Sequence, residues 1–239
     1  MAQTKRWSRN TMQPLRLQKM PVLSSLSPRD WEKVKGLFTE KHFGKDDYIF
    51  FEGDPSSWLG VVLEGRVKMI KHSGTGKDVV LDLIAPGEML GEAAAFNGEP
   101  HPVTAQAMEP TVMAIIHQDD YLRLLKQYPA LTLRVIEEQG RQLREAQETI
   151  KSMAVERVER RIARILLKLA ATTGSSSEGG IIVIELPLTR QDIAEMSGTT
   201  VETAIRTMSR FRKKGLVQTK RGRVTILQPH ELVKIAEEL

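Results

Sequence analysis

The sequence contains no cysteine. This absence excludes disulfides, zinc–thiolate sites, thiol catalysis and cysteine-ligated iron–sulfur clusters. It also suits a reducing compartment, so we expect the protein to be cytoplasmic. Long apolar runs are missing as well, because no segment approaches the roughly 20 apolar residues that span a bilayer. The N-terminus is basic without an apolar stretch behind it, so it is not predicted to be a signal peptide, and we expect no membrane partner.

Acidic residues are absent from one end of the chain. Residues 1–20 carry five basic and no acidic residues and are interpreted as a basic, flexible arm. Residues 21–155 carry 15 basic and 20 acidic residues, and residues 156–239 carry 15 and 10, so charges of +5, −5 and +5 add up to the net +5 of the chain. A basic C-terminal module on an acidic body indicates a polyanionic partner, although a solvated surface has the same composition.

Short β-type runs and glycines dominate residues 43–118. The runs occupy residues 48–51, 59–63, 67–70, 79–84, 103–107 and 112–116. Many short strands separated by glycine turns favour a sandwich or barrel. Residues 89–96 are more typical of a helix than of a strand. A helix over 28–38, with Ser27 as its N-cap, is predicted to precede the whole region.

A long helix is predicted over residues 130–153, after a shorter helix that is capped by Asp119 or Asp120. Heptad positions a and d of the long helix form a mostly apolar seam with charged flanks. The seam consists of Leu133, Ile136, Gly140, Leu143, Gln147 and Ile150. Packing against the helix's own domain and a two-helix dimer both fit this pattern, and the charged flanks favour the dimer. The glycine and the glutamine would weaken such an interface.

The most informative segment of the sequence is residues 189–215. It is predicted to follow an amphipathic helix over 158–171, a flexible loop over 172–180 and a strand over 181–186. In this segment a capping box opens a short helix, a Ser-Gly turn follows, and a second capping box opens a longer helix that ends at a glycine. A short helix, a tight turn and a second helix form the helix-turn-helix pattern.

The two capping boxes are Thr189-Arg-Gln-Asp192 and Thr199-Thr-Val-Glu202. The outer face of the second helix carries the candidate base-contacting residues. These are Val201, Glu202, Ile205, Arg206 and Ser209. Arginine can donate a bidentate pair to guanine, and glutamate can accept from cytosine N4. Two alternatives stay open, because Glu202 could serve only as a cap and Arg206 could lie on a solvated helix face.

Two β-type runs, 216–218 and 224–227, flank a basic turn and predict a hairpin, the wing of a winged helix-turn-helix. Basic residues on a wing contact phosphates, which position a protein on DNA without specifying the sequence. The candidate phosphate contacts are Arg190, Gln191, Thr199, Thr200, Arg210, Lys220, Arg221 and Arg223. The sequence therefore predicts that the protein binds double-stranded DNA.

A glycine-rich β-roll, a long helix and a winged helix-turn-helix, in this order, resemble the CRP/FNR family of bacterial transcription regulators. The resemblance covers residues 22–235. It rests on Gly53-Asp54, Gly65, Gly87, Gly91-Glu92, Thr189-Arg-Gln-Asp-Ile-Ala-Glu and Glu202-Thr-Ala-Ile-Arg206. It implies an α+β fold with a cyclic-nucleotide-binding-like jelly roll over 21–118 as the effector-sensing domain. A dimerisation helix over 119–155 and a winged helix-turn-helix DNA-binding domain over 156–239 would follow.

The resemblance also implies roles for single residues of the second helix. The family's base-contacting glutamate and arginine fall on Glu202 and Arg206. Val201 stands where the FNR branch also has valine and the cyclic AMP receptor branch has arginine, whereas Ile205 replaces the serine of the FNR branch. The DNA half-site is therefore expected to lean toward that of the FNR branch.

The effector pocket that the resemblance implies departs from the family pattern. It contains Gly91, Glu92, Ala93, His101, Pro102 and Gln147. In the family the glutamate holds the ribose hydroxyl of cyclic AMP, and an Arg-Ser pair binds the phosphate. Here that pair falls on His101 and Pro102, and the purine-contacting Thr-Ser pair falls on Ala146 and Gln147. Because histidine replaces a bidentate arginine poorly near neutral pH and proline lacks a backbone donor, cyclic AMP is not expected as the effector.

Haem is an alternative ligand, because some members of the family sense gases through haem. Four histidines are candidate axial ligands. They are His42, His72, His101 and His117.

We expect a sequence-specific, homodimeric transcription regulator that binds a palindromic operator and has RNA polymerase as a further partner. An effector in the roll would control it, or it would be constitutive. The alternative is a cyclic-nucleotide-like ligand-binding module that acts without DNA. An enzyme is not expected, because no Ser–His–Asp set, phosphate loop or metal-ligand spacing stands in the sequence.

Overall fold

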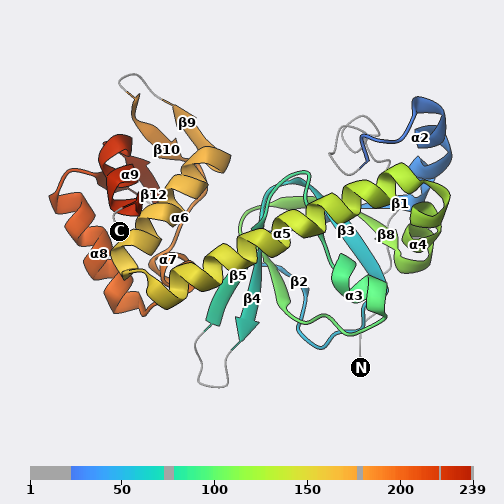
Figure 1. Ribbon diagram of the computed structural model, residues 1–239, viewed down its shortest axis with the longest axis horizontal. Helices are drawn as coiled ribbons and strands as arrows, with labels where there is room; N and C mark the ends of the chain where they lie inside the picture. Colours follow the sequence, from blue (N-terminus) through green and yellow to red (C-terminus); the bar gives the residue numbers. More distant parts are fainter. Residues whose placement is uncertain (1–22, 73–77, 177–179, 221, 238–239) are drawn as a thin grey trace. The chain divides into compact units, whose positions relative to one another are not determined.

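The structure is a computed structural model that describes residues 23–72, 78–176, 180–220 and 222–237 (Figure 1). The chain forms two compact units. One unit contains the described residues up to Met69 together with Leu83–Arg141, and the other contains Ile70–Asp82 and the described residues from Gln142 onward.

The β-roll consists of two four-stranded sheets, with strand orders β1-β8-β3-β6 and β2-β7-β4-β5. The strands are β1 (Phe38–Phe43), β2 (Tyr48–Phe50), β3 (Trp58–Glu64), β4 (Val67–His72), β5 (Asp78–Ile84), β6 (Met89–Leu90), β7 (Thr104–Ala107) and β8 (Thr111–His117). All six predicted runs are strands. The sequence did not reveal β1, because only its two end residues, Phe38 and Phe43, are apolar and buried.

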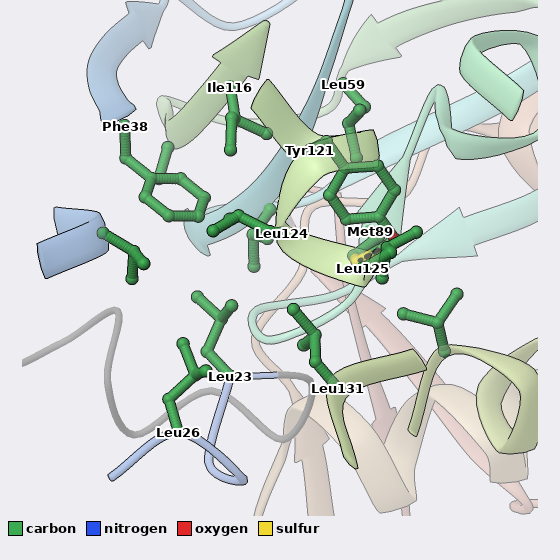
Figure 2. Packing of buried hydrophobic residues seen from close by; sticks show 14 of the residues in the cluster. Leu23, Leu26, Phe38, Leu59, Met89, Ile116, Tyr121, Leu124, Leu125 and Leu131 are labelled. Carbon is green, nitrogen blue, oxygen red and sulfur yellow. Dashed lines mark hydrogen bonds between the residues drawn. The ribbon is translucent and has the colours of Figure 1, made fainter. Parts of the chain in front are cut away.

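Strand β3 is an internal strand of its sheet, between β8 and β6, and is buried on both faces. Val62 packs with residues of the other sheet, whereas Val61 and Leu63 pack on the opposite side with the helices. Successive side chains of a strand point to opposite faces, so one strand contributes to two clusters. Figure 2 shows the helix-side cluster, where Tyr121 and Leu124 of α4 (Gln118–Gln127) gather with strand residues.

Two short helices, α2 (Pro28–Val34) and α3 (Glu92–Asn97), contribute Trp31 and Ala95 to the helix-side cluster. The N-cap of α2, Ser27, accepts from the Asp30 amide as predicted, and a 3-10 turn ends the helix at Leu37. Helix α3 begins later than expected, because Met89–Leu90 pairs with β3 before Gly91 turns into the left-handed region at φ 85°.

Two further predictions on helix starts were tested by the structure. The N-cap of α4 is His117, whose side chain accepts from the Asp119 amide, so the assignment of Asp119 or Asp120 as the cap was wrong. The long helix α5 (Pro129–Val155) is continuous over 27 residues, and proline at its first position needs no amide donor there. The prediction of a long helix over 130–153 is confirmed.

The C-terminal module combines helices with one antiparallel sheet, whose strand order is β11-β12-β10-β9. Its elements are α6 (Val158–Thr173), β9 (Gly174–Ser176), β10 (Ile182–Ile184), α7 (Arg190–Met196), α8 (Val201–Lys213), β11 (Val217–Lys220), β12 (Arg223–Ile226) and α9 (Pro229–Glu237). Strand β9 lies within the predicted loop over 172–180, because it pairs with β10. Residues 177–179 of that loop lie outside the described residues.

Candidate DNA-binding surface and effector site

Helices α7 and α8 with the turn between them form a helix-turn-helix. The predicted capping box at the start of α7 is confirmed: the Asp192 amide donates to Thr189 Oγ1 at 3.0 Å, and the Thr189 amide donates to Asp192 Oδ2 at 2.9 Å. Gly198 makes the turn at φ 58°, in the left-handed region that favours glycine. The Thr199 amide donates to the carbonyl of Ala194 at 3.0 Å and closes the turn.

The start of α8 differs from the prediction by one residue. Thr200 is the N-cap and accepts from the Thr203 amide at 3.3 Å, so the capping box from Thr199 to Glu202 was wrong. Thr199 belongs to the turn instead, and Glu202 becomes the second helical residue. Hydrogen bonds from its own amide and from Thr200 lower the pKa of the Glu202 carboxyl, which keeps this exposed group ionised.

The two faces of α8 differ sharply in burial. The inner face packs into the module through Ala204, Thr207, Met208 and Phe211. On the outer face Glu202 and Arg206 are exposed, Ile205 is 42% exposed, and Val201 and Ser209 are half-buried. All five predicted base-contacting residues therefore lie outside the buried face. Arg206 Nη2 donates to Thr203 Oγ1 at 3.2 Å, a contact that the i, i+3 spacing could have indicated.

The predicted wing is confirmed as the hairpin of β11 and β12, which pair from Val217 to Lys220. Lys220 is exposed at its end, and Arg221 lies outside the described residues. Arg223 forms an ion pair with Glu185 at 3.7 Å, and Arg210 of α8 forms one with Glu159 of α6. Two candidate phosphate ligands thus already have an acidic partner within the chain.

The remaining candidate phosphate ligands lie near the starts of α7 and α8. Gln191 is exposed, and its side-chain amide donates to Glu195 at 2.6 Å. Arg190 and Thr199 are half-buried, and Thr200 is the N-cap described above. Amides and side chains at helix starts are suited to anions, so the placement is compatible with phosphate binding.

Three residues of the implied effector pocket lie close together in the roll. A Cβ atom added to Gly91 would lie 3.4 Å from His101 Cε1. Glu92 is buried, and Gln139 of α5 donates to its Oε1 at 2.9 Å. Burial, and secondarily the Glu92 carboxylate, raises the pKa of the Tyr121 hydroxyl far above its usual value.

His101 is buried within the roll and lies flat against Phe50, with ring centroids 3.7 Å apart and ring planes 7° apart. Burial lowers the pKa of its imidazole, and the carboxylate of Asp54 opposes this shift only in part. His101 is therefore a neutral ring in a stack. Three other predicted pocket residues, Ala93, Pro102 and Gln147, are exposed.

The other candidate haem ligands have partners on the surface of the chain. His42 contacts Glu40 at 2.8 Å, His72 contacts Asp78 at 2.8 Å, and His117 caps α4. Among the residues that the structure describes, no group of three or more His, Asp or Glu side chains is placed to hold a metal ion.

The seam of α5 is uncovered in the single chain. Its four large apolar residues, Leu133, Ile136, Leu143 and Ile150, are between 61% and 68% exposed. Gly140 is half-buried and Gln147 is exposed on the same helix. Two other apolar residues of this helix, Leu131 and Val135, are buried in the core of the roll instead. The seam thus faces solvent rather than the domain's own core.

Comparison with known proteins identifies both modules. A family model described as "Cyclic nucleotide-binding domain" matches residues 40–128, and one described as "Crp-like helix-turn-helix domain" matches residues 160–235. The chain belongs to the CRP/FNR family of transcription regulators. Both the predicted family and the predicted fold class are therefore confirmed.

Several CRP/FNR relatives match most of the chain. The cyclic AMP receptor protein of Thermus thermophilus is 26% identical over 90% of this chain and 96% of its own. The transcriptional activator protein Anr of Pseudomonas aeruginosa is 28% identical over 80% of this chain and 78% of its own. A solved CRP-family regulator from Thermus thermophilus matches with a TM-score of 0.72 and 26% identity, over 82% of this chain and 96% of that one.

These CRP/FNR relatives are regulators of transcription, and the Crp-like helix-turn-helix implies that this protein binds DNA. FixK2 of Bradyrhizobium japonicum, with a TM-score of 0.74 at 20% identity over 84% of this chain and 98% of that one, shows the same fold. None of the helices in the described parts of the chain is long and apolar enough to cross a membrane.

Proposed function

We propose that this CRP/FNR regulator binds a palindromic operator as a homodimer and recognises each half-site with α8. The observation that carries the proposal is the exposed pair Glu202 and Arg206, one turn apart near the start of a helix whose other face is buried. The N-terminal part of a recognition helix lies nearest the base edges. An ionised glutamate and an arginine there suit cytosine N4 and guanine O6 and N7.

The uncovered seam of α5 supports the dimeric part of the proposal. Leu133, Ile136, Leu143 and Ile150 recur at heptad spacing, and the chain's own core leaves them exposed. Exposed apolar stripes of this kind are typical of interfaces. A second copy of α5 would cover them, and two copies of α8 would then be available for the two halves of a palindrome.

For the roll, we propose that cyclic AMP is not the effector. The Glu92 carboxylate already accepts from Gln139, and the neutral ring of His101 is stacked on Phe50. A cyclic phosphate needs a fixed, charge-assisted donor, which this ring does not supply. The relative named cyclic AMP receptor protein favours the opposite conclusion, but at 26% identity its ligand does not transfer to this chain.

We further propose RNA polymerase as the protein partner and the cytoplasm as the location.

Salt titrations of two variants test the recognition surface. Arg206→Ala should weaken binding to a selected palindrome by roughly 2–6 kcal/mol, since each bidentate pair contributes about 1–3 kcal/mol and the dimer has two. Binding to scrambled DNA should fall much less. Lys220→Ala serves as the control: it should weaken both DNAs alike and flatten the salt slope by about one unit per lost phosphate contact. Equal losses on both DNAs for Arg206→Ala would contradict the role of α8.

A further inference from the structure

Helices α5 and α6 meet at an elbow of two residues, Glu156 and Arg157. The Glu156 amide still donates to the carbonyl of Ser152 at 3.0 Å, so the backbone leaves α5 without a flexible linker. The elbow and the part of α5 from Gln142 onward belong to the same compact unit as the helix-turn-helix.

The side chain of Glu156 connects three elements. It is 6% exposed and accepts from Ser152 Oγ of α5 at 2.6 Å. Its other oxygen pairs with Arg164 at 2.7 Å and with Arg160 at 3.6 Å, both on α6. The same two arginines donate to the carbonyl of Ala236 in α9, at 2.9 Å from Arg160 and 3.4 Å from Arg164.

Electrostatics keep this carboxylate charged. Burial alone would raise the pKa of Glu156, but the hydrogen bond from Ser152 and the charges of Arg164 and Arg160 outweigh it and lower the pKa. A buried carboxylate that loses its partners, or arginines that lose their carboxylate, leave uncompensated charge. The arrangement therefore resists opening of the elbow.

A second set of hydrogen bonds, made by Arg161, connects the elbow to the turn of the helix-turn-helix. Arg161 Nη1 donates to the carbonyl of Glu156 at 2.7 Å, and its Nε donates to the carbonyl of Ser197 at 2.8 Å. Met153 of α5 packs at the same turn, since its Cε lies 3.3 Å from where a Cβ on Gly198 would stand. The end of α5 is thus fixed against the motif that carries α8.

We propose that Glu156 is a positioning residue that sets the half-site spacing which the dimer accepts. The inference rests on the proposed function, since it takes α5 as the dimer interface and α8 as the recognition helix. In such a dimer each α8 is connected to the interface through its elbow, so a rigid elbow fixes the distance and angle between the two recognition helices. One added base pair moves a half-site by about 3.4 Å and about a tenth of a turn, which a rigid dimer does not follow.

The test measures the affinity of the full-length protein for one selected palindrome, for its spacer variants lengthened or shortened by one or two base pairs, and for a single half-site. The wild type should prefer one spacing by about tenfold or more. Glu156→Gln should lose about tenfold at that spacing, bind the altered spacers within about threefold of it, and keep its half-site affinity and salt slope. Ser152→Ala should broaden the preference in the same direction by a smaller factor.

Glu148→Gln is the matched control, because this exposed residue of α5 pairs with Lys151 at 3.5 Å and has no role in the elbow. It should keep the wild-type spacing preference. Light scattering checks that each variant is dimeric. If Glu156→Gln and Ser152→Ala are folded dimers with an unchanged spacing preference, or if Glu156→Gln does not fold and Ser152→Ala leaves the preference unchanged, the elbow inference is wrong. A wild type that binds neither palindrome nor half-site would overturn the proposed function together with it.

Discussion

Burial of the His101 ring affects both the packing of the roll and the protonation of the imidazole. Stacked on Phe50, it fills space in the roll as an aromatic side chain does. Because burial lowers its pKa, the folded protein holds it neutral at a pH where the unfolded chain already binds a proton. Its contribution to stability is therefore complete above about pH 6.5 and is lost as the pH falls through the folded-state pKa.

Replacing His101 by phenylalanine should reduce the acid sensitivity of the roll. The ring and its stack on Phe50 are kept, but the group that must become charged is removed, so the pH dependence of stability should flatten below about pH 6.5. Thermal unfolding of wild type and His101→Phe between neutral and mildly acidic pH measures this. Parallel losses of melting temperature in the two proteins would show that other groups cause the acid sensitivity.

The exposure of residues along one helix was easier to predict from the sequence than contacts between residues far apart in the chain. Glu202 and Arg206 follow from helical periodicity, and the structure leaves both exposed. The partner of Glu92 is Gln139, 47 positions later, and only the tertiary fold brings the two together. The pairing of Arg210 with Glu159 belongs to the same class. No local pattern encodes such pairs.

Among the elements, those whose own residues show a clear local pattern were predicted, including short ones such as β2 and α7, whereas β1, β6 and β9 were not. Helices α5, α6 and α8 each span at least three turns, which is enough to show their period. Strand β6 has two residues, and β9 exists because Ser176 pairs with Ile182 across a Gly- and Ser-rich segment. At the start of α8, two adjacent threonines are both able to cap, and only the hydrogen bonds of the turn select Thr200.

A charge in the seam of α5 should separate the subunits. Leu143→Lys places an ammonium group in the middle of an otherwise apolar stripe, so we expect a monomer whose operator affinity is lower by about a hundredfold or more, because the second half-site no longer contributes. Light scattering and gel shifts measure the two effects. Glu148→Lys introduces the same side chain at an exposed position outside the seam and should stay dimeric. A Leu143→Lys protein that remains a dimer with full affinity would exclude this face as the interface.

At the scale of the whole molecule, the order of modules was predictable because each has its own pattern: glycine-punctuated strands, a heptad helix and a capped helix pair. The identity of the effector could not be predicted from the sequence, because it depends on which side chains fill the interior of the roll. Here the sequence contributed one useful departure, His101 at the position of an arginine, and the structure shows what that ring packs against.

Calorimetry with cyclic AMP tests this view of the roll. We expect no binding tighter than about 1 mM, because no charged donor stands at His101 and Glu92 is already held by Gln139. A low-micromolar dissociation constant that disappears in Glu92→Ala would show that the roll rearranges to accept the nucleotide, and cyclic AMP would then be the effector.

The composition of the α5 seam has a consequence for gene dosage. Gly140 and Gln147 alternate with its leucines and isoleucines, so the homodimer proposed above is held by a short and interrupted apolar stripe. When the chain is scarcer than the dissociation constant of the dimer, the amount of dimer follows the square of the chain concentration, and halving the number of chains removes about three quarters of the active species. Operator occupancy would then change more steeply than in proportion to the copy number of the protein, even in a cell where no small molecule changes.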